Sequence, residues 1–426
     1  MNAMIFIVFL GLMFIGIPVS AAIGMALFGH SLVWDTVSLV YIGRSMVGCL
    51  DSYPILAVPM FILAGEIMGQ GGISRRLFNV ANAIMGRFTG GVPMATVMTC
   101  MLFGAVSGSG AATFSAVGMI MIPLMEKQGY NKKFVTGLTA SSGGLGVLIP
   151  PSLPIVMYGI SVNESIGELF LAGVFPGLIS GIALMIYTWF YCKRNPVVVV
   201  ASSERTMGIR ESLKDGFWAL LAPIIILGGI YLGAFTATEA AAVAVLYGIL
   251  VSRLVFKTVK WREVPSFLLN AAALNAPILL IVAMATVLGR VLSVEGVPGQ
   301  LAEAVLGFST NPVVILLCIN LMLLVVGMFM DTLPAIIILA PILLPIAEAI
   351  GLSTIHFGMI MVANLAIGFV TPPIGACLFL ASAITKLSIA EISKNVIGPI
   401  IALLVALLFI IIFPQLSEFL PGLLRN

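Results

Sequence analysis

A short motif of small and polar residues in the first half of this apolar chain could bind cations. Ser107 and Ser109 supply hydroxyl groups, and a Pro-Pro pair begins further along at Pro150. Because two adjacent prolines interrupt an α-helix, nearby carbonyl groups such as those of Gly146 and Leu148 are freed from helical hydrogen bonds. Hydroxyl and freed carbonyl oxygens at broken helices coordinate small hard cations such as sodium. We therefore predict a sodium site formed by Ser107, Ser109, Gly146, Leu148 and Pro150.

The same pattern occurs a second time. Gly-x-x-x-Pro-Pro spans residues 146–151 and returns at residues 368–373. In the second copy Gly327, Gly368 and Thr371 play the matching parts, so we predict a second sodium site there. The alternative interpretation is that these small residues only let membrane helices pack closely.

Two ionisable residues, Arg290 and Asp331, lie within or beside apolar segments and are candidate substrate ligands. An arginine can hold a carboxylate with two parallel hydrogen bonds, and Asp331 could accept from a substrate hydroxyl or amide group. Ser107 is the third candidate for contact with substrate. The structural alternatives are that Arg290 extends to the membrane interface and that Asp331 caps a helix that begins at Thr332.

Glu66 is a further ionisable residue deep in an apolar segment, between Gly65 and Ile67. We interpret it as a hydrogen-bond partner on a helix-packing face. Glu239 follows Thr236 at the spacing of a helix capping box, so a structural role is favoured for it.

Both motifs belong to a repeat with one constant spacing of 222 residues. The shared positions pair Pro123 with Pro345, Glu126 with Glu348, Gly129 with Gly351, Gly146 with Gly368, and Pro150-Pro151 with Pro372-Pro373. A single register held over this length indicates a two-fold internal repeat.

The composition is that of a polytopic membrane protein. Hydrophobic residues make up 61% of the 426 residues and charged residues only 9%, against about a quarter in soluble domains. The net charge of +3 does not favour a nucleic-acid partner. An intramembrane enzyme is not favoured. The chain has only two histidines for a metal site or catalytic triad, and its spans contain no paired aspartates and no Ser-Lys pair. The sequence contains no phosphate-binding loop, so ATP is not the expected energy source and no organic cofactor is expected.

Runs of apolar residues predict an all-α fold with about nine crossings and two re-entrant hairpins. The crossings include 3–29, which is interrupted at Gly16 and Pro18, and 395–421. We assign residues 1–192 to a first repeat, with a hairpin at 91–126 and an interrupted helix at 134–162. Residues 193–236 form a basic linker and a connecting span. Residues 237–426 form the second repeat, with a hairpin at 312–347 and an interrupted helix at 357–385. The segment 71–90, which holds Arg75, Arg76 and Arg87, is interpreted as a loop.

The distribution of basic residues predicts that the second repeat is inverted in the membrane. Loop 126–133 holds three lysines, whereas its counterpart at 348–355 holds no Lys or Arg. Since basic loops face the cytoplasm, the equivalent loops lie on opposite sides and the N-terminus lies in the cytoplasm. Inverted repeats with broken helices at the midplane are typical of secondary transporters.

Four strings resemble the large membrane subunit of TRAP (tripartite ATP-independent periplasmic) transporters across essentially the whole chain. They are PMFILAGEIM (59–68), GLGVLIPPSLP (144–154), AGVFPGLISG (172–181) and GGIYLGAFTATEAAAVAV (228–245), which departs from the family pattern only at Ala237. The resemblance implies a sodium-driven elevator transporter of the bacterial inner membrane that imports carboxylate-bearing solutes, such as C4-dicarboxylates, sialic acid and other sugar or keto acids. It implies two partners, a separate four-helix membrane subunit and a periplasmic substrate-binding protein. It also implies that the basic residue before the second hairpin, matched here by Arg290, and the acidic residue at its tip, matched by Asp331, handle substrate.

Two alternatives remain open from the sequence. One is a stand-alone sodium-coupled carboxylate transporter of related architecture, and the other is a channel. Polar residues clustered at the hairpin tips favour an enclosed site over a continuous pore.

Overall fold

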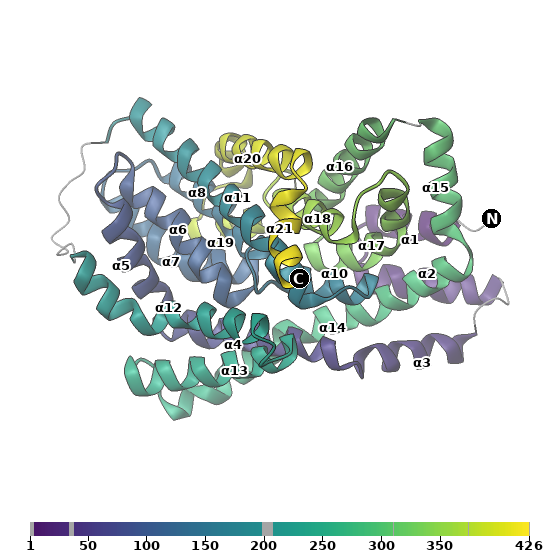
Figure 1. Ribbon diagram of the computed structural model, residues 1–426, viewed down its shortest axis with the longest axis horizontal. Coiled ribbons are helices and arrows are strands. Elements are labelled where there is room, and N and C mark those ends of the chain that lie inside the picture. Colours follow the sequence, from purple (N-terminus) through teal and green to yellow (C-terminus); the bar gives the residue numbers. More distant parts are fainter. Residues whose placement is uncertain (1–3, 34–37, 198–207, 310, 374, 426) are drawn as a thin grey trace.

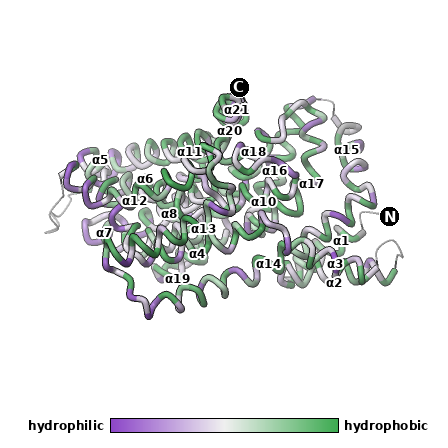
Figure 2. Tube along the Cα trace, turned by 60° about the horizontal axis from the view of Figure 1, so that its bottom comes forward, coloured by the Kyte–Doolittle hydropathy of each residue, from purple (hydrophilic) through white to green (hydrophobic). Residues whose placement is uncertain are grey.

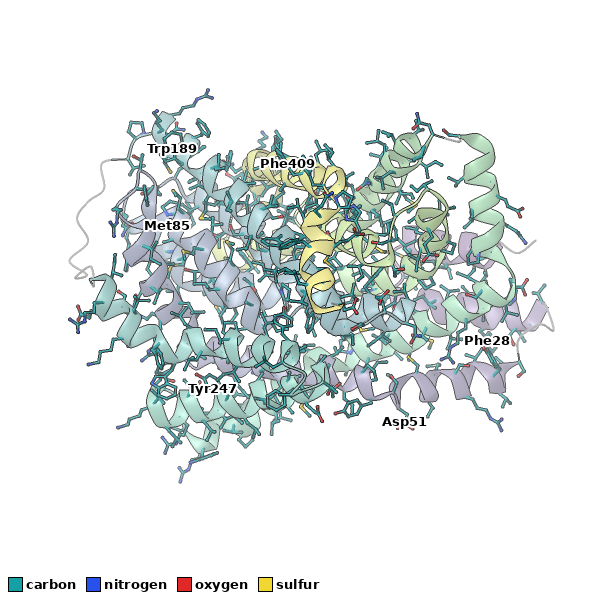
Figure 3. All side chains as sticks on the ribbon, viewed as in Figure 1. Phe28, Asp51, Met85, Trp189, Tyr247 and Phe409 are labelled. Carbon is teal, nitrogen blue, oxygen red and sulfur yellow. The ribbon has the colours of Figure 1, made fainter. Side chains whose placement is uncertain are left out.

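The computed structural model describes residues 4–33, 38–197, 208–309, 311–373 and 375–425, and its regular elements are helices (Figure 1). Nine described segments are long and apolar enough to cross a membrane. Hydrophobic residues, shown in green, occur along the helices throughout the molecule (Figure 2). Phe28 and Phe409, each 51% exposed, lie at the periphery of the helices, as expected of side chains that face lipid (Figure 3). The prediction of an all-α polytopic membrane protein is confirmed.

The chain begins with two helices where the sequence predicted one crossing at 3–29. These are α1 (Met4–Phe14) and α2 (Val19–Val33). Gly16 adopts a φ of +91°, outside the helical range, and Pro18 lacks the N–H that a continuous helix needs. The break between α1 and α2 is the interruption that the sequence predicted at Gly16 and Pro18. α3 (Leu39–Leu50) and a 3₁₀ turn (Tyr53–Leu56) follow.

The first series of helices contains one hairpin and one interrupted helix. It comprises α4 (Ala57–Gln70), α5 (Ile73–Met85), α6 (Gly91–Ser107), α7 (Gly110–Lys127), α8 (Lys132–Gly143), α9 (Leu145–Leu148), α10 (Leu153–Val162) and α11 (Ile166–Arg194). The connecting span is α12 (Ile209–Tyr231). It is followed by α13 (Ala237–Leu250), a π-helical turn (Val251–Val255) and a 3₁₀ turn (Trp261–Glu263). Residues 198–207 of the predicted linker lie outside the described residues.

The second series repeats this order. It comprises α14 (Val264–Val294), α15 (Val297–Phe308), α16 (Pro312–Phe329), α17 (Thr332–Ala349), α18 (Thr354–Gly368), α19 (Ala376–Thr385) and α20 (Ile389–Ile412). The predicted last span at 395–421 was wrong at its end, because the chain leaves helical geometry at Phe413 and starts α21 (Gln415–Arg425).

Helix boundaries reproduce the repeat spacing of the sequence. α7 and α17 begin at Gly110 and Thr332 and end at Lys127 and Ala349, so both of their ends are 222 positions apart. The structure thus confirms the expected fold class, a repeat with two helical hairpins and two interrupted helices. In Figure 1 the first hairpin, α6–α7, lies toward one end of the molecule and the second, α16–α17, toward the other.

The repeat also contains α5 and α15, which the sequence interpretation had not assigned. Each helix is preceded by a glycine whose backbone lies in the left-handed region: Gly72 (φ +79°) before α5 and Gly296 (φ +69°) before α15. In α5 the buried residues Ile73, Leu77 and Ala81 recur every four positions, which is the pattern of an amphipathic helix. A search for uniformly apolar spans does not detect such a helix, so segment 71–90 was wrongly read as a loop.

Each hairpin packs its turn against an interrupted helix. The first turn is fixed by a hydrogen bond from the Leu153 amide to the Gly108 carbonyl oxygen (3.0 Å). Near the second turn the backbones of Gly327 and Gly368 touch, since a Cβ built on Gly368 would lie 2.5 Å from the Gly327 Cα atom. Below the hairpins, α4 and α14 pack against each other in the lower part of the view in Figure 1, with α13 and α3 beneath them.

Candidate functional site

A cavity of about 650 Å³ lies between the two hairpin turns. Its walls come from both halves of the chain: α4 and the first turn on one side, and α14, the second turn and α19 on the other. The polar residues that line it are Glu66, Gln70, Ser107, Ser109, Ser115, Asp331 and Thr332. A cavity of this size suits a small organic molecule.

The first turn carries a compact group of oxygen atoms. Ser107 is fully buried, and its Oγ lies 2.9 Å from Thr113 Oγ1 and donates to the Ser109 carbonyl oxygen (3.4 Å). Ser109 caps α7 by accepting from the Ala112 amide (3.4 Å). Thr113 was missed by the sequence analysis. The available signal was its position one helical turn after Ser109, on the same face of α7.

Gly146 joins this group through its backbone. A Cβ at Gly146 would lie 2.9 Å from the Ser109 carbonyl oxygen and would also meet Thr113 Oγ1. Leu148 and Pro150 lie elsewhere. The Leu148 carbonyl oxygen and the Pro150 ring lie against Gly173 of α11. The structure therefore brings together Ser107, Ser109 and Gly146, with Thr113 added.

Near the second turn, the backbones of Gly327 and Gly368, two residues of the predicted second site, are in contact. Thr371, the third residue, donates a hydrogen bond from its Oγ1 to the Ile367 carbonyl oxygen (2.7 Å). Asn364, one turn before Gly368 on α18, was missed. Its amide Nδ2 donates to Asn320 Oδ1, and its own Oδ1 is buried without a hydrogen-bond partner among the described residues. This oxygen is an additional potential ligand close to the second turn.

Asp331 caps a helix, as one of the two interpretations expected, and it also lies on the cavity wall. Its Oδ1 accepts from the Thr332 amide (2.7 Å) and from Thr332 Oγ1 (3.3 Å), which makes it the N-cap of α17. The residue also lines the cavity and has an exposed side chain. Helix capping therefore leaves part of its carboxylate available to a ligand.

Arg290 is not brought to this cavity. It is exposed on α14, whose cavity-lining residues are Leu274 and Ile278. Arg290 follows Ile278 by 12 residues, or about 18 Å along a helix that rises 1.5 Å per residue. The structure thus places Asp331 and Ser107, but not Arg290, on the cavity wall.

Glu66 is the second carboxylate on the cavity wall. The sequence analysis treated it as a packing residue, and it does join two helices: its Oε1 accepts from Gln70 Nε2 (2.5 Å) on α4 and from Asn270 Nδ2 (3.1 Å) on α14. Its position on the cavity wall depends on how α4 crosses α14, which residue spacing does not show.

Comparisons with known proteins agree in one family. The family model described as "Tripartite ATP-independent periplasmic transporter, DctM component" matches residues 6–416. The chain is 42% identical, over 96% of its length, to an isethionate TRAP transporter permease protein of Oleidesulfovibrio alaskensis, and spans 64% of that relative. It is 37% identical to the sialic acid TRAP transporter large permease protein of Vibrio cholerae, over 97% of both chains. It is 40% identical to a C4-dicarboxylate TRAP transporter large permease protein of Pseudomonas aeruginosa, over 87% of both.

Among solved structures, the fold is similar to that of the Alcanivorax borkumensis YdaH transporter. The TM-score is 0.62 at 15% sequence identity, and the similarity covers 87% of both chains. At this identity the similarity concerns the fold alone.

Proposed function

This chain belongs to the DctM family of tripartite ATP-independent periplasmic (TRAP) transporters, and from that premise we propose that it is the transport subunit of a sodium-coupled importer of carboxylate-bearing solutes. The family is one of transporter permeases, not of enzymes. The observation that supports the proposal most is the cavity between two repeat-related hairpin turns, with oxygen-rich groups beside it.

We assign sodium to these two turns. Ser107, Ser109, Thr113 and Gly146 gather hydroxyl and carbonyl oxygens at the first turn. Gly327, Gly368, Thr371 and the unpaired Asn364 oxygen lie near the second. Such uncharged oxygen ligands at helix ends suit a monovalent cation in a membrane transporter. Sodium would then enter with the substrate, and the hairpins would move with it in an elevator-type motion.

The substrate is assigned to the cavity between the turns, in contact with Ser107 and Asp331. The similar permeases are named for the transport of isethionate, sialic acid and C4-dicarboxylates. Because all of these are small organic acids, we propose a small organic acid as the substrate of this chain. The family description, tripartite and periplasmic, supports two partners. These are a small membrane subunit of four helices and a periplasmic substrate-binding protein. We place the chain in the bacterial inner membrane with its N-terminus in the cytoplasm, from the distribution of Lys and Arg.

Replacement of Ser107 by alanine tests the first sodium site. Ser107→Ala removes one oxygen ligand and the partner of Thr113, at an expected cost of about 1–3 kcal/mol. The sodium concentration that half-saturates transport should therefore rise by about fivefold or more. Sodium-dependent uptake and sodium-dependent thermal stabilisation measure the effect. Ser293→Ala is the matched control, because that hydroxyl bonds only within α14, to the Gly289 carbonyl oxygen. An unchanged sodium dependence in Ser107→Ala would remove Ser107 from the site.

A further inference from the structure

The charge of the cavity wall limits which organic acid can bind there. Among the described residues that line the cavity, two carry a formal charge, Glu66 and Asp331, and none is Lys, Arg or His. The wall therefore offers carboxylates and hydroxyls to a substrate that is itself an anion.

Each of the two carboxylates has one oxygen occupied by the protein and one available. Glu66 receives both of its hydrogen bonds on Oε1, from Gln70 and Asn270. Asp331 receives both of its hydrogen bonds on Oδ1, from Thr332. Glu66 Oε2 and Asp331 Oδ2 have no hydrogen-bond partner among the described residues. Both residues line the cavity and retain exposed surface, so the structure leaves these two oxygens free of protein hydrogen bonds beside the cavity.

The structural role of Glu66 does not explain its charge. A glutamine at this position could accept the same hydrogen bonds from Gln70 and Asn270 through its amide oxygen. An ionised carboxylate deep in an apolar span is costly without a compensating interaction. A ligand that donates hydrogen bonds to Oε2 would supply that interaction, since bonds to a charged acceptor are the stronger ones.

We propose, on the basis of the function assigned above, that this cavity selects substrates with a single anionic group and several hydroxyl or amide donors, and that Glu66 excludes dianions. The anionic group lies with the co-transported sodium at the first turn, and the donors face Glu66 and Asp331. A second anionic group would instead meet these carboxylates. A like charge at about 5 Å, at an effective dielectric constant of about 20, weakens binding by about a hundredfold.

This proposal is tested by measuring how tightly organic acids bind to the membrane complex itself. The periplasmic binding protein is left out, so that its own substrate preference does not affect the result. The full chain, with its small membrane subunit in nanodiscs and saturating sodium, is titrated with gluconate, N-acetylneuraminate, isethionate and succinate at a pH where both succinate carboxyls are ionised. Gluconate and N-acetylneuraminate should bind at least about tenfold more tightly than succinate. In Glu66→Gln this preference should shrink by about tenfold, because succinate binds better. Glu126→Gln, at an exposed ion pair with Lys132 (3.7 Å) outside the cavity, should keep the wild-type preference.

The outcomes separate this inference from the function on which it rests. If succinate binds the wild-type complex as tightly as gluconate, in a sodium-dependent manner, the inference is overturned and the transport function stands. A folded Glu66→Gln variant with an unchanged preference overturns the role of Glu66. If none of the four acids binds with sodium dependence, the proposed function itself fails. Should Glu66→Gln not fold, the ranking of the wild-type ligands still decides.

Discussion

Asp331→Asn is expected to lose most sodium-driven uptake while the protein still folds and inserts. Asparagine is as good an N-cap as aspartate, so α17 keeps its cap when the charge is removed. The change removes the negative charge from the cavity wall and replaces one acceptor oxygen by an amide donor. Losing a hydrogen bond to a charged group costs about 1.5–3 kcal/mol, which corresponds to a decrease of about tenfold to a hundredfold in transport efficiency.

The measurement is the initial rate of uptake into proteoliposomes with both partner proteins present. Asp51→Asn is the matched control, because Asp51 is an exposed residue at the C-terminal end of α3 (Figure 3). If Asp331→Asn transports at the wild-type rate with unchanged apparent affinity, Asp331 is only a helix cap and the substrate binds elsewhere.

Gly368→Ala should block transport for a steric reason. An added Cβ would lie 2.5 Å from Gly327 Cα and 2.7 Å from the Gly327 carbonyl carbon, so backbone rather than a flexible side chain must move. Overpacking of this kind costs about 1–3 kcal/mol. It would also push the second hairpin away from the interrupted helix and distort the sodium site that we propose there. We expect near-complete loss of uptake and a lower thermal stability that sodium no longer restores.

Gly289→Ala is the control for this substitution. Gly289 lies within α14 with no atom within 4 Å of an added Cβ, and alanine favours a helix interior by about 1 kcal/mol over glycine. Wild-type uptake and sodium affinity in Gly368→Ala would show that the contact with Gly327 is not required for the site.

The repeat could be predicted from the sequence because its signal is local. The Pro-Pro pairs and capping residues recur at one spacing, and the structure places Ser109 and Asp331 at equivalent N-caps of α7 and α17. The amphipathic helix α5 was missed because it is not a uniformly apolar span.

The composition of the site was harder to predict, because it depends on how distant helices cross. Thr113 joins the group of oxygen atoms at the first turn only because α7 folds back on Ser107. Glu66 reaches the cavity wall only because α4 packs against α14. For Arg290 the sequence shows a charged residue in an apolar segment. It does not show in which direction α14 extends from the cavity, and therefore whether Arg290 reaches the cavity wall. The structure places it away from the cavity, and its pairing with Asp331 remains a prediction from the family resemblance.

The most direct test of the central claim is uptake by the complete transporter in proteoliposomes under one imposed gradient at a time. An inward sodium gradient should drive accumulation of a radiolabelled organic acid, and the accumulation should disappear when potassium replaces sodium, even with an imposed proton gradient. Undiminished uptake with potassium and a proton gradient would contradict sodium coupling and, with it, the assignment of the two hairpin turns as sodium sites.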